Sequence, residues 1–236
     1  MTPARSARKG KGLQAPRIPE VRLENLELGN PDDLENGARI DGQEFSGLET
    51  GQLDLGNATL MECSFADLAV DEADLRSVRL RDSVIARSRF GSLRGGRGDW
   101  RDVRIEGVRI GSAEMYENTW TSVHFVDCKL TYLNLRAAGL RDVAFTRCTI
   151  EELDLADAKA RSVAFTETEV RVLDVQRAEL NEVDLRGAQL HRITGLGHLR
   201  GTTVTSVQLT QLAPLLAAEF GMTVDDTAPQ PIPPLS

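Results

Sequence analysis

The chain has 236 residues, 41% of them hydrophobic, and a formal net charge of −8 at pH 7, which is the balance of a globular protein. It contains no run of about 18–20 apolar residues that would cross a membrane, and its N-terminus lacks the apolar segment of a signal peptide. We therefore expect a cytoplasmic protein. The three cysteines have no C-x-x-C spacing, which argues against a disulfide framework or a zinc site.

The chain begins with a basic segment, residues 1–20, which we expect to be a disordered arm. Residues 21–30 then place apolar side chains two and three apart. Residues 30–38 break this spacing, and we expect them to form a loop at the first turn of the following domain.

From residue 40 to residue 190 the large apolar side chains recur every five residues. Of the 31 positions that are multiples of five, 29 are apolar, the exceptions being Thr50 and Gly95, and the position two residues earlier is apolar in 25 of 31 cases. An amphipathic helix would repeat every three to four residues and a half-buried strand every two. Two residues of each pentad are therefore expected to face inward and three outward.

Several pentads resemble the pentapeptide repeat A-(D/N)-L-x-x, among them LDLGN (53–57), ADLRS (73–77), LNLRA (133–137) and VDLRG (183–187). The resemblance implies an all-β fold: a right-handed, quadrilateral parallel β-helix with one pentad per side and four sides per coil. We expect about eight coils over residues 21–195. Residues 20 apart should then stack, which would place phenylalanines in one column and Trp100 on Trp120. Glycines at 95 and 98 are expected to mark a thin coil and to leave room for the Trp100 indole.

After the repeats, residues 205–221 have helical spacing, with a capping-box pattern at Thr205 and Gln208, a stop at Gly221 and a bend or break at Pro214. We expect residues 196–224 to cap the open end of the β-helix or to form a dimer through the apolar stripe Leu209, Leu212, Leu216 and Phe220. Residues 225–236 are Pro-rich and are expected to be a disordered tail.

No catalytic, cofactor or metal site is predicted. The cysteines occupy inward positions, where they act as small apolar side chains, and the histidines share no ligand spacing. Cys128 and Cys148 stack, but a disulfide is not expected in a reducing compartment.

Charge is the informative feature of the surface. Residues 21–75 hold 14 acidic and 2 basic residues, whereas residues 76–109 hold 10 arginines and 4 acids. An acidic column of Asp54, Asp74, Asp154 and Asp174 is expected to point outward, and Arg89 and Arg109 should stack on one face. The recurring arginines Arg81, Arg101, Arg141 and Arg161 are expected to form surface ion pairs with the acids of the next column, Asp82, Asp102, Asp142 and Glu182.

Two functions fit these features. The preferred interpretation is a non-catalytic protein-interaction module, whose protein partner the sequence does not identify. The alternative comes from the resemblance: Qnr- and MfpA-like members imitate DNA and bind gyrase or topoisomerase IV, protecting against quinolones. The acidic region supports this alternative and the arginine band opposes it. Neither interpretation requires a cofactor, a membrane or direct binding of nucleic acid.

Overall fold

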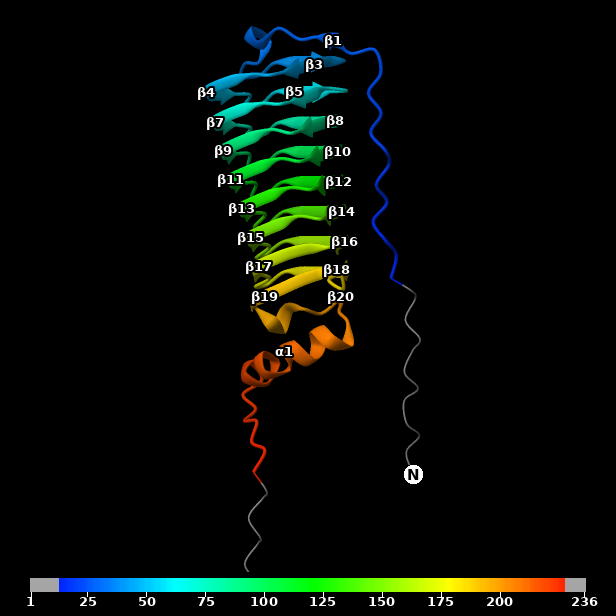
Figure 1. Cartoon of the computed structure of the whole chain (residues 1–236), viewed down its shortest axis with the longest axis vertical. Coiled ribbons are helices and arrows are strands. Elements are labelled where there is room, and N and C mark those ends of the chain that lie inside the picture. The colour runs from blue at the N-terminus through cyan, green and yellow to red at the C-terminus, as the bar shows by residue number, and fades with distance from the viewer. Residues whose placement is uncertain (1–12, 228–236) are drawn as a thin grey trace, which may run out of the picture.

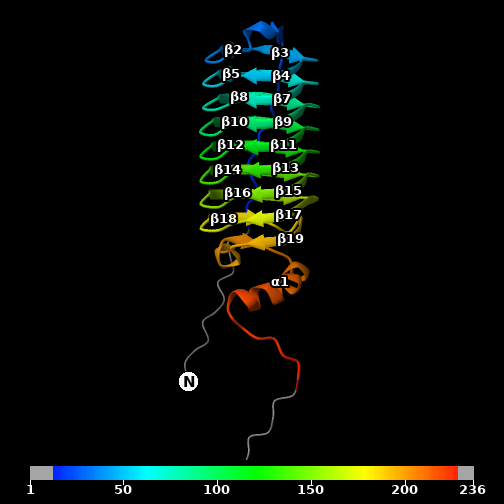
Figure 2. The same ribbon diagram turned by 90° about the vertical axis from the view of Figure 1, so that its left-hand side faces the viewer.

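The computed structural model describes residues 13–227 and consists mainly of short parallel strands wound into a rod (Figures 1 and 2). The strands form a 12-stranded and an 8-stranded parallel sheet, and the rod has about nine turns. The expected parallel β-helix is confirmed. The structure has about one turn more than expected, and pairing begins at Glu27 and continues to Thr203, beyond both ends of the five-residue phase.

The regular elements follow one another along the chain with short turns between them. In order they are β1 (Glu27–Leu28), the 3-10 helix η1 (Pro31–Asp33), β2 (Arg39–Asp41), β3 (Gln43–Ser46), β4 (Glu49–Asp54), β5 (Thr59–Met61), β6 (Ser64–Ala66), β7 (Ala69–Asp74), β8 (Arg79–Ala86), β9 (Arg89–Arg94), β10 (Asp99–Glu106), β11 (Arg109–Glu114), β12 (Thr119–Val126), β13 (Lys129–Asn134), β14 (Gly139–Thr146), β15 (Thr149–Asp154), β16 (Lys159–Thr166), β17 (Thr168–Asp174), β18 (Glu179–Asp184), β19 (Ala188–Thr194), the 3-10 helix η2 (Leu196–His198), β20 (Thr202–Thr203) and α1 (Ser206–Glu219).

The register of these strands confirms the stacking of residues 20 apart. Phe125, Phe145 and Phe165 are paired in neighbouring strands, and their rings stack with centroids 5.0 and 5.1 Å apart. Trp100 and Trp120 stack at 5.5 Å. Backbone N–H and C=O groups of neighbouring coils form hydrogen bonds with one another. The interior is therefore filled mainly by these apolar columns.

Two glycines leave space for neighbouring interior side chains, which was expected for Gly98 beside Trp100 but not for Gly95 beside Met115. A Cβ on Gly95 would lie 2.2 Å from the sulfur of Met115, so the sulfur fills the space that the missing side chain leaves. A Cβ on Gly98 would lie 3.3 Å from Nε1 of Trp100.

Some inward positions are polar because the backbone at the coil corners needs partners. The hydroxyls of Ser83, Ser88 and Thr168 accept hydrogen bonds from backbone N–H groups one coil earlier, at 3.0, 3.0 and 3.2 Å. The cysteines occupy equivalent positions: Sγ of Cys128 donates to the carbonyl of Val126 at 3.2 Å. All three cysteines are buried and free.

The N-terminal segment lies along the outside of the rod before the first coil begins (Figure 1). The backbone N–H of Arg17 donates to Oδ1 of Asp142 at 2.9 Å, and Oγ of Ser122 donates to the Arg17 carbonyl at 3.2 Å. The part of the expected disordered arm that the structure describes, residues 13–20, is therefore held against the rod, and residues 1–12 lie outside the described residues. We call residues 13–26 the strap.

The C-terminal helix α1 lies across the last coil, with Thr205 as its N-cap and a complete capping box to Gln208. Pro214 lies inside the helix and does not split it. Nε2 of Gln208 also donates to the carbonyls of Leu185 and Ala188, at 2.6 and 2.8 Å. One side chain thus covers two acceptors of the open sheet edge, which agrees with a capping role.

Only half of the expected apolar stripe of α1 faces the rod. Leu212 is buried and Leu216 is half-buried, whereas Leu209 and Phe220 are 51% and 68% exposed. No helix in residues 13–227 is both long and apolar enough to span a membrane.

Candidate functional site

The outer surface of the rod contains ladders of ion pairs between neighbouring coils. Arg147 forms two hydrogen bonds with Asp127, both 2.8 Å long, and Arg177 forms the same paired contact with Asp157. The hydrogen bond from Arg147 holds the pKa of Asp127 below its ordinary value. Within each pair the two residues lie one coil apart in the same column, so opposite charges are stacked directly on one another, and the two pairs lie in different columns.

The predicted acidic column exists, but its carboxylates are largely occupied. Asp54 stacks on Asp74, and Asp154 stacks on Asp174. Oδ1 of each accepts the backbone N–H two residues ahead, at 2.8–3.0 Å. Asp74 also pairs with Arg76, and Asp154 pairs with Arg136 and is only 6% exposed. The expectation that all four point freely outward is therefore wrong for Asp154, because this position makes the turn that follows the strand.

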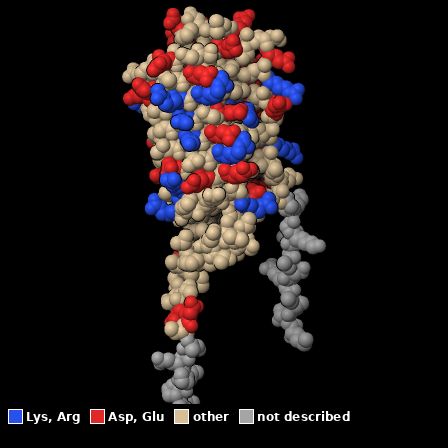
Figure 3. All heavy atoms as spheres, viewed as in Figure 1, with Lys and Arg blue, Asp and Glu red and all other residues tan. Residues whose placement is uncertain are grey.

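Free negative charge is found instead at the N-terminal end of the rod. A group of exposed acids lies there without an ion-pair partner among residues 13–227: Asp32, Asp33, Glu35, Asp41, Glu44 and Glu49. We call these residues the acidic end. In Figure 3 acidic side chains appear at this end of the visible face and basic ones begin further down the rod.

Arg89 and Arg109 are stacked, as expected, in strands β9 and β11 of the 8-stranded sheet. Lys129 continues the column in β13. All three are exposed, and none has an ion-pair partner in the described part of the chain. This column is a basic stack on the surface of the 8-stranded sheet.

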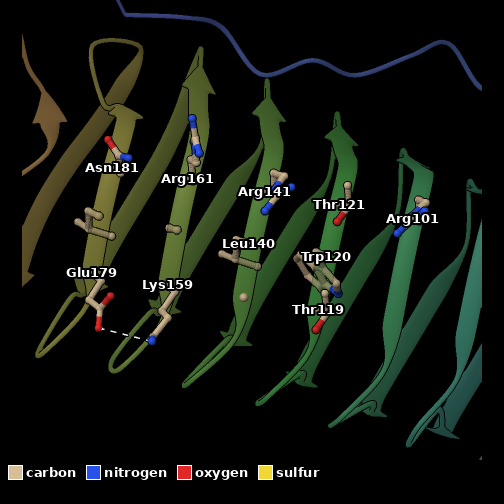
Figure 4. A pocket seen from close by; sticks show the side chains of 13 residues that line it. Arg101, Thr119, Trp120, Thr121, Leu140, Arg141, Lys159, Arg161, Glu179 and Asn181 are labelled. Carbon is tan, nitrogen blue, oxygen red and sulfur yellow. Dashed lines mark ion pairs between the residues drawn. The ribbon is translucent and has the colours of Figure 1, made fainter.

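A second basic column lies in the 12-stranded sheet, beside a groove of about 710 Å³. Its members are Arg81, Arg101, Thr121, Arg141 and Arg161, paired strand to strand from β8 to β16. Figure 4 shows Arg101, Thr121, Arg141 and Arg161 in one row, with Lys159 on the other side of the groove. We call this surface the arginine groove.

The ion-pair lattice expected for these arginines is mostly not formed. Arg161 lies 3.7 Å from Glu182, and Arg81 pairs with Asp99 rather than with Asp82. Arg101 and Arg141 have no ion pair among residues 13–227. The chain turns a corner at Asp102 and Asp142, where φ is 54°, and the carboxylate of Asp142 binds the strap instead. The sequence spacing correctly predicted that the arginines share a column, but it did not predict which acid each arginine would pair with.

The strap also forms a small site that the sequence did not predict. Ile18, Val21, Val103 and Arg104 line a cavity together with His124. Nε2 of His124 lies 2.9 Å from the hydroxyl oxygen of Thr146. Burial, and then the charges of Arg104 and Arg147, lower the pKa of His124 below its ordinary value. A sequence signal was present, since outward positions of this face are apolar at Val84, Ala144 and Ala164.

The described residues contain no group of three or more His, Cys, Asp or Glu side chains arranged to hold a metal ion. Burial raises the pKa of the Cys63 thiol, so this thiol is protonated near neutral pH and is a poor nucleophile. The surface therefore offers charged faces as its candidate functional features.

The comparison with protein families agrees with this architecture. The model of the family described as "Pentapeptide repeat region" matches residues 118–194. The chain is similar in structure to a trypsin-treated form of QnrB1, a plasmid-mediated fluoroquinolone resistance protein, with 18% identity and a TM-score of 0.42 over 82% of this chain and 95% of that chain. Full-length QnrB1 gives 12% identity and a TM-score of 0.32 over 73% and 99% of the two chains. No curated protein matches the sequence significantly. Residues 118–194 are therefore similar to a pentapeptide repeat region, and the same five-residue phase extends from residue 40 to residue 190.

Proposed function

We propose that the protein is a non-catalytic interaction module, a stiff rod that presents differently charged faces to protein partners. The observation that carries this proposal is the segregation of free charge. The acidic end has carboxylates without ion-pair partners in the described structure, and two separate columns farther along the rod have free cations. Such separated fields select partners by complementary charge and direct their approach.

The test is capture of partners by variants that differ on one face only. Tagged wild-type protein would be cross-linked in cells and compared with a variant whose acidic end is neutralised, Asp41→Asn with Glu44→Gln and Glu49→Gln. A second variant carries Arg89→Glu and Arg109→Glu. We expect at least one partner to be lost from one variant and kept by the other. Identical capture by all three proteins would contradict a charge-selective module.

A second candidate function, imitation of DNA toward gyrase or topoisomerase IV, is favoured by the acidic end. A surface that binds a polyanion can accept a rod with matching negative charge. The acidic column is a weaker candidate for this contact, because Asp74 and Asp154 are neutralised by arginines. In this hypothesis the acidic end makes the contact.

A supercoiling assay separates the two candidates. If the protein imitates DNA, it should inhibit gyrase, and the inhibition should weaken with salt, since charges are screened over about 8–10 Å. Neutralising the acidic end should abolish inhibition. Changing Asp54, Asp74, Asp154 and Asp174 together to Asn should reduce it less, and Arg89→Glu with Arg109→Glu should strengthen it. Absence of inhibition at every protein concentration would leave only the interaction module.

We also propose that the module is a homodimer through α1. Val207, Leu209, Phe220, Met222 and Val224 are between 51% and 71% exposed around this helix. An apolar patch at the end of a rod can be covered by the same patch of a second copy across a two-fold axis.

A further inference from the structure

Arginines are stacked in two ways on this rod. Some lie directly over an acid of the preceding coil, as Arg147 does over Asp127 and Arg177 over Asp157. The arginine groove, like the exposed column of Arg89 and Arg109, stacks like charges instead. In the groove, Arg81 is paired with Arg101, and Arg141 with Arg161. Strands are about 4.8 Å apart, and like charges directly opposite one another destabilise a sheet. An arrangement of charges that lowers the stability of the fold is expected where a surface binds a partner.

The groove is also hollow and cationic. Four cations line it, Arg101, Arg141, Lys159 and Arg161, against one acid, Glu179. The ion pair of Glu179 with Lys159 is 3.7 Å long, and the two side chains are 73% and 74% exposed, so it neutralises little. Gly139 forms part of the floor, and a Cβ built on it meets nothing within 4 Å.

We propose that the arginine groove binds an extended acidic peptide segment of a partner protein, lying along the rod axis across the strands. This inference rests on the interaction module and adds its surface and the chemistry of its partner. Arg101 and Arg161 are three strand spacings apart, or about 14 Å. In an extended peptide, side chains on one side repeat about every 6.7 Å, so carboxylates at positions i, i+2 and i+4 span about 13 Å. Arginine binds such carboxylates through two parallel hydrogen bonds.

The groove favours a peptide over a nucleic acid. Single-stranded nucleic acids are held largely by bases stacked on aromatic side chains. The aromatic residue that lines the groove, Trp120, is fully buried inside the coil and offers no ring to a base. Three acids, Asp102, Asp142 and Glu182, occupy the column next to the arginines, at the neighbouring corner. They would repel the wide backbone of a duplex more than a narrow peptide confined to the groove.

The test uses defined peptides and four forms of the full-length protein. A fluorescein-labelled peptide of four Glu-Thr repeats, its Gln-Thr counterpart and a 12-residue oligothymidylate serve as probes for anisotropy titrations at low salt. The variants are Arg141→Glu with Arg161→Glu, and Gly139→Tyr, which fills the groove without changing charge. Arg89→Glu with Arg109→Glu is the matched control, with the same charge change in the other sheet.

We expect the Glu peptide to bind and the Gln peptide to bind at least tenfold more weakly. Both groove variants should lose at least tenfold in affinity, the control should change less than twofold, and all variants should keep the wild-type circular dichroism. Equal losses in the groove and control variants would indicate unspecific charge attraction and overturn the proposal. So would tighter binding of the oligothymidylate, or no binding of the Glu peptide at millimolar concentration. If the cross-linked partners survive Gly139→Tyr, this groove is rejected while the interaction module stands.

Discussion

Phe145 stacks face to face on Phe165, with ring centroids 5.1 Å apart and ring planes inclined by 8°. Phe145 is 1% exposed and also stacks on Phe125 in the preceding coil. One ring therefore forms part of two coil interfaces. The interior of each coil consists of only a few side chains, so neighbouring side chains cannot fill the space left by a smaller residue at this position.

We expect Phe145→Ala to lower the free energy of unfolding by about 3–5 kcal/mol, the usual cost of deleting a buried aromatic ring. Phe145→Asp should prevent folding, since it buries a charge without a partner. Arg141→Ala, on the outer side of the same strand, should change stability by less than about 1 kcal/mol. Urea unfolding followed by circular dichroism measures all three. Similar losses for Phe145→Ala and Arg141→Ala would mean that the inner and outer faces are assigned wrongly.

Gln208 should be a stabilising residue of the rod's C-terminal end. Gln208→Ala removes the hydrogen bonds to the Thr205 N–H and to the carbonyls of Leu185 and Ala188. We expect a loss of about 1–3 kcal/mol, because a cap is removed and each of the two carbonyls loses one donor, although that of Leu185 keeps the Ala188 N–H. Hydrogen exchange of the Leu185 and Ala188 region should rise in the variant. The neighbouring exposed change Thr210→Ala is the control, and equal effects of the two would contradict a role for Gln208 at the sheet edge.

His124 should make stability depend on pH in the weakly acidic range. Its folded-state pKa is lowered, first by burial and then by Arg104 and Arg147, while Glu106 acts in the opposite direction. The unfolded chain therefore takes up a proton at higher pH than the folded chain does. The stabilising contribution is present above the unfolded-state value of about 6.5 and is lost as pH falls through the folded-state pKa.

We therefore expect the melting temperature of the wild type to fall between pH 7.5 and pH 5.5, and His124→Gln to fall less over the same interval. Deleting residues 1–20 should move the His124 pKa back toward its ordinary value, because the strap closes the cavity around the ring. An NMR titration of the imidazole measures this shift directly. A pKa that does not change on deletion would show that the strap does not bury His124.

The fold could be predicted from the sequence because the same five-residue spacing of apolar residues recurs in every coil. Phe145, Trp120 and Gly98 were placed correctly from spacing alone, since each belongs to a repeat that fixes which side of the strand faces inward. Polar inward residues such as Ser83 break the apolar pattern without breaking the fold, because they serve backbone groups at the corners.

The surface contacts were predicted less well, because the repeat determines which residues share a column but not which residues form ion pairs or hydrogen bonds. Asp142 follows Arg141 in the chain, yet it binds Arg17, which is 125 residues away in sequence. Asp154 belongs to an outward column, yet it accepts the Ala156 N–H and becomes buried. The corners themselves recur every five residues, as the positive φ values of Arg97, Asp102 and Gly107 show. The partner that each carboxylate finds depends on the strap and on local contacts, which do not repeat.

The exposed side of α1 offers a test of the proposed dimer that leaves the cap intact. Leu209 and Phe220 are exposed, whereas Leu212 is buried against the rod. Leu209→Lys with Phe220→Lys should therefore keep the circular dichroism and melting temperature of the wild type while converting a dimer to a monomer in light scattering, because charges that would meet across the interface repel. Leu212→Lys should instead lower stability, by burying a charge at the rod end. A wild-type protein that is monomeric at every concentration would refute the dimer, and so would a double-lysine variant of unchanged dimeric mass. Deleting residues 205–236 removes both roles at once, and we expect the bare sheet edge to drive aggregation.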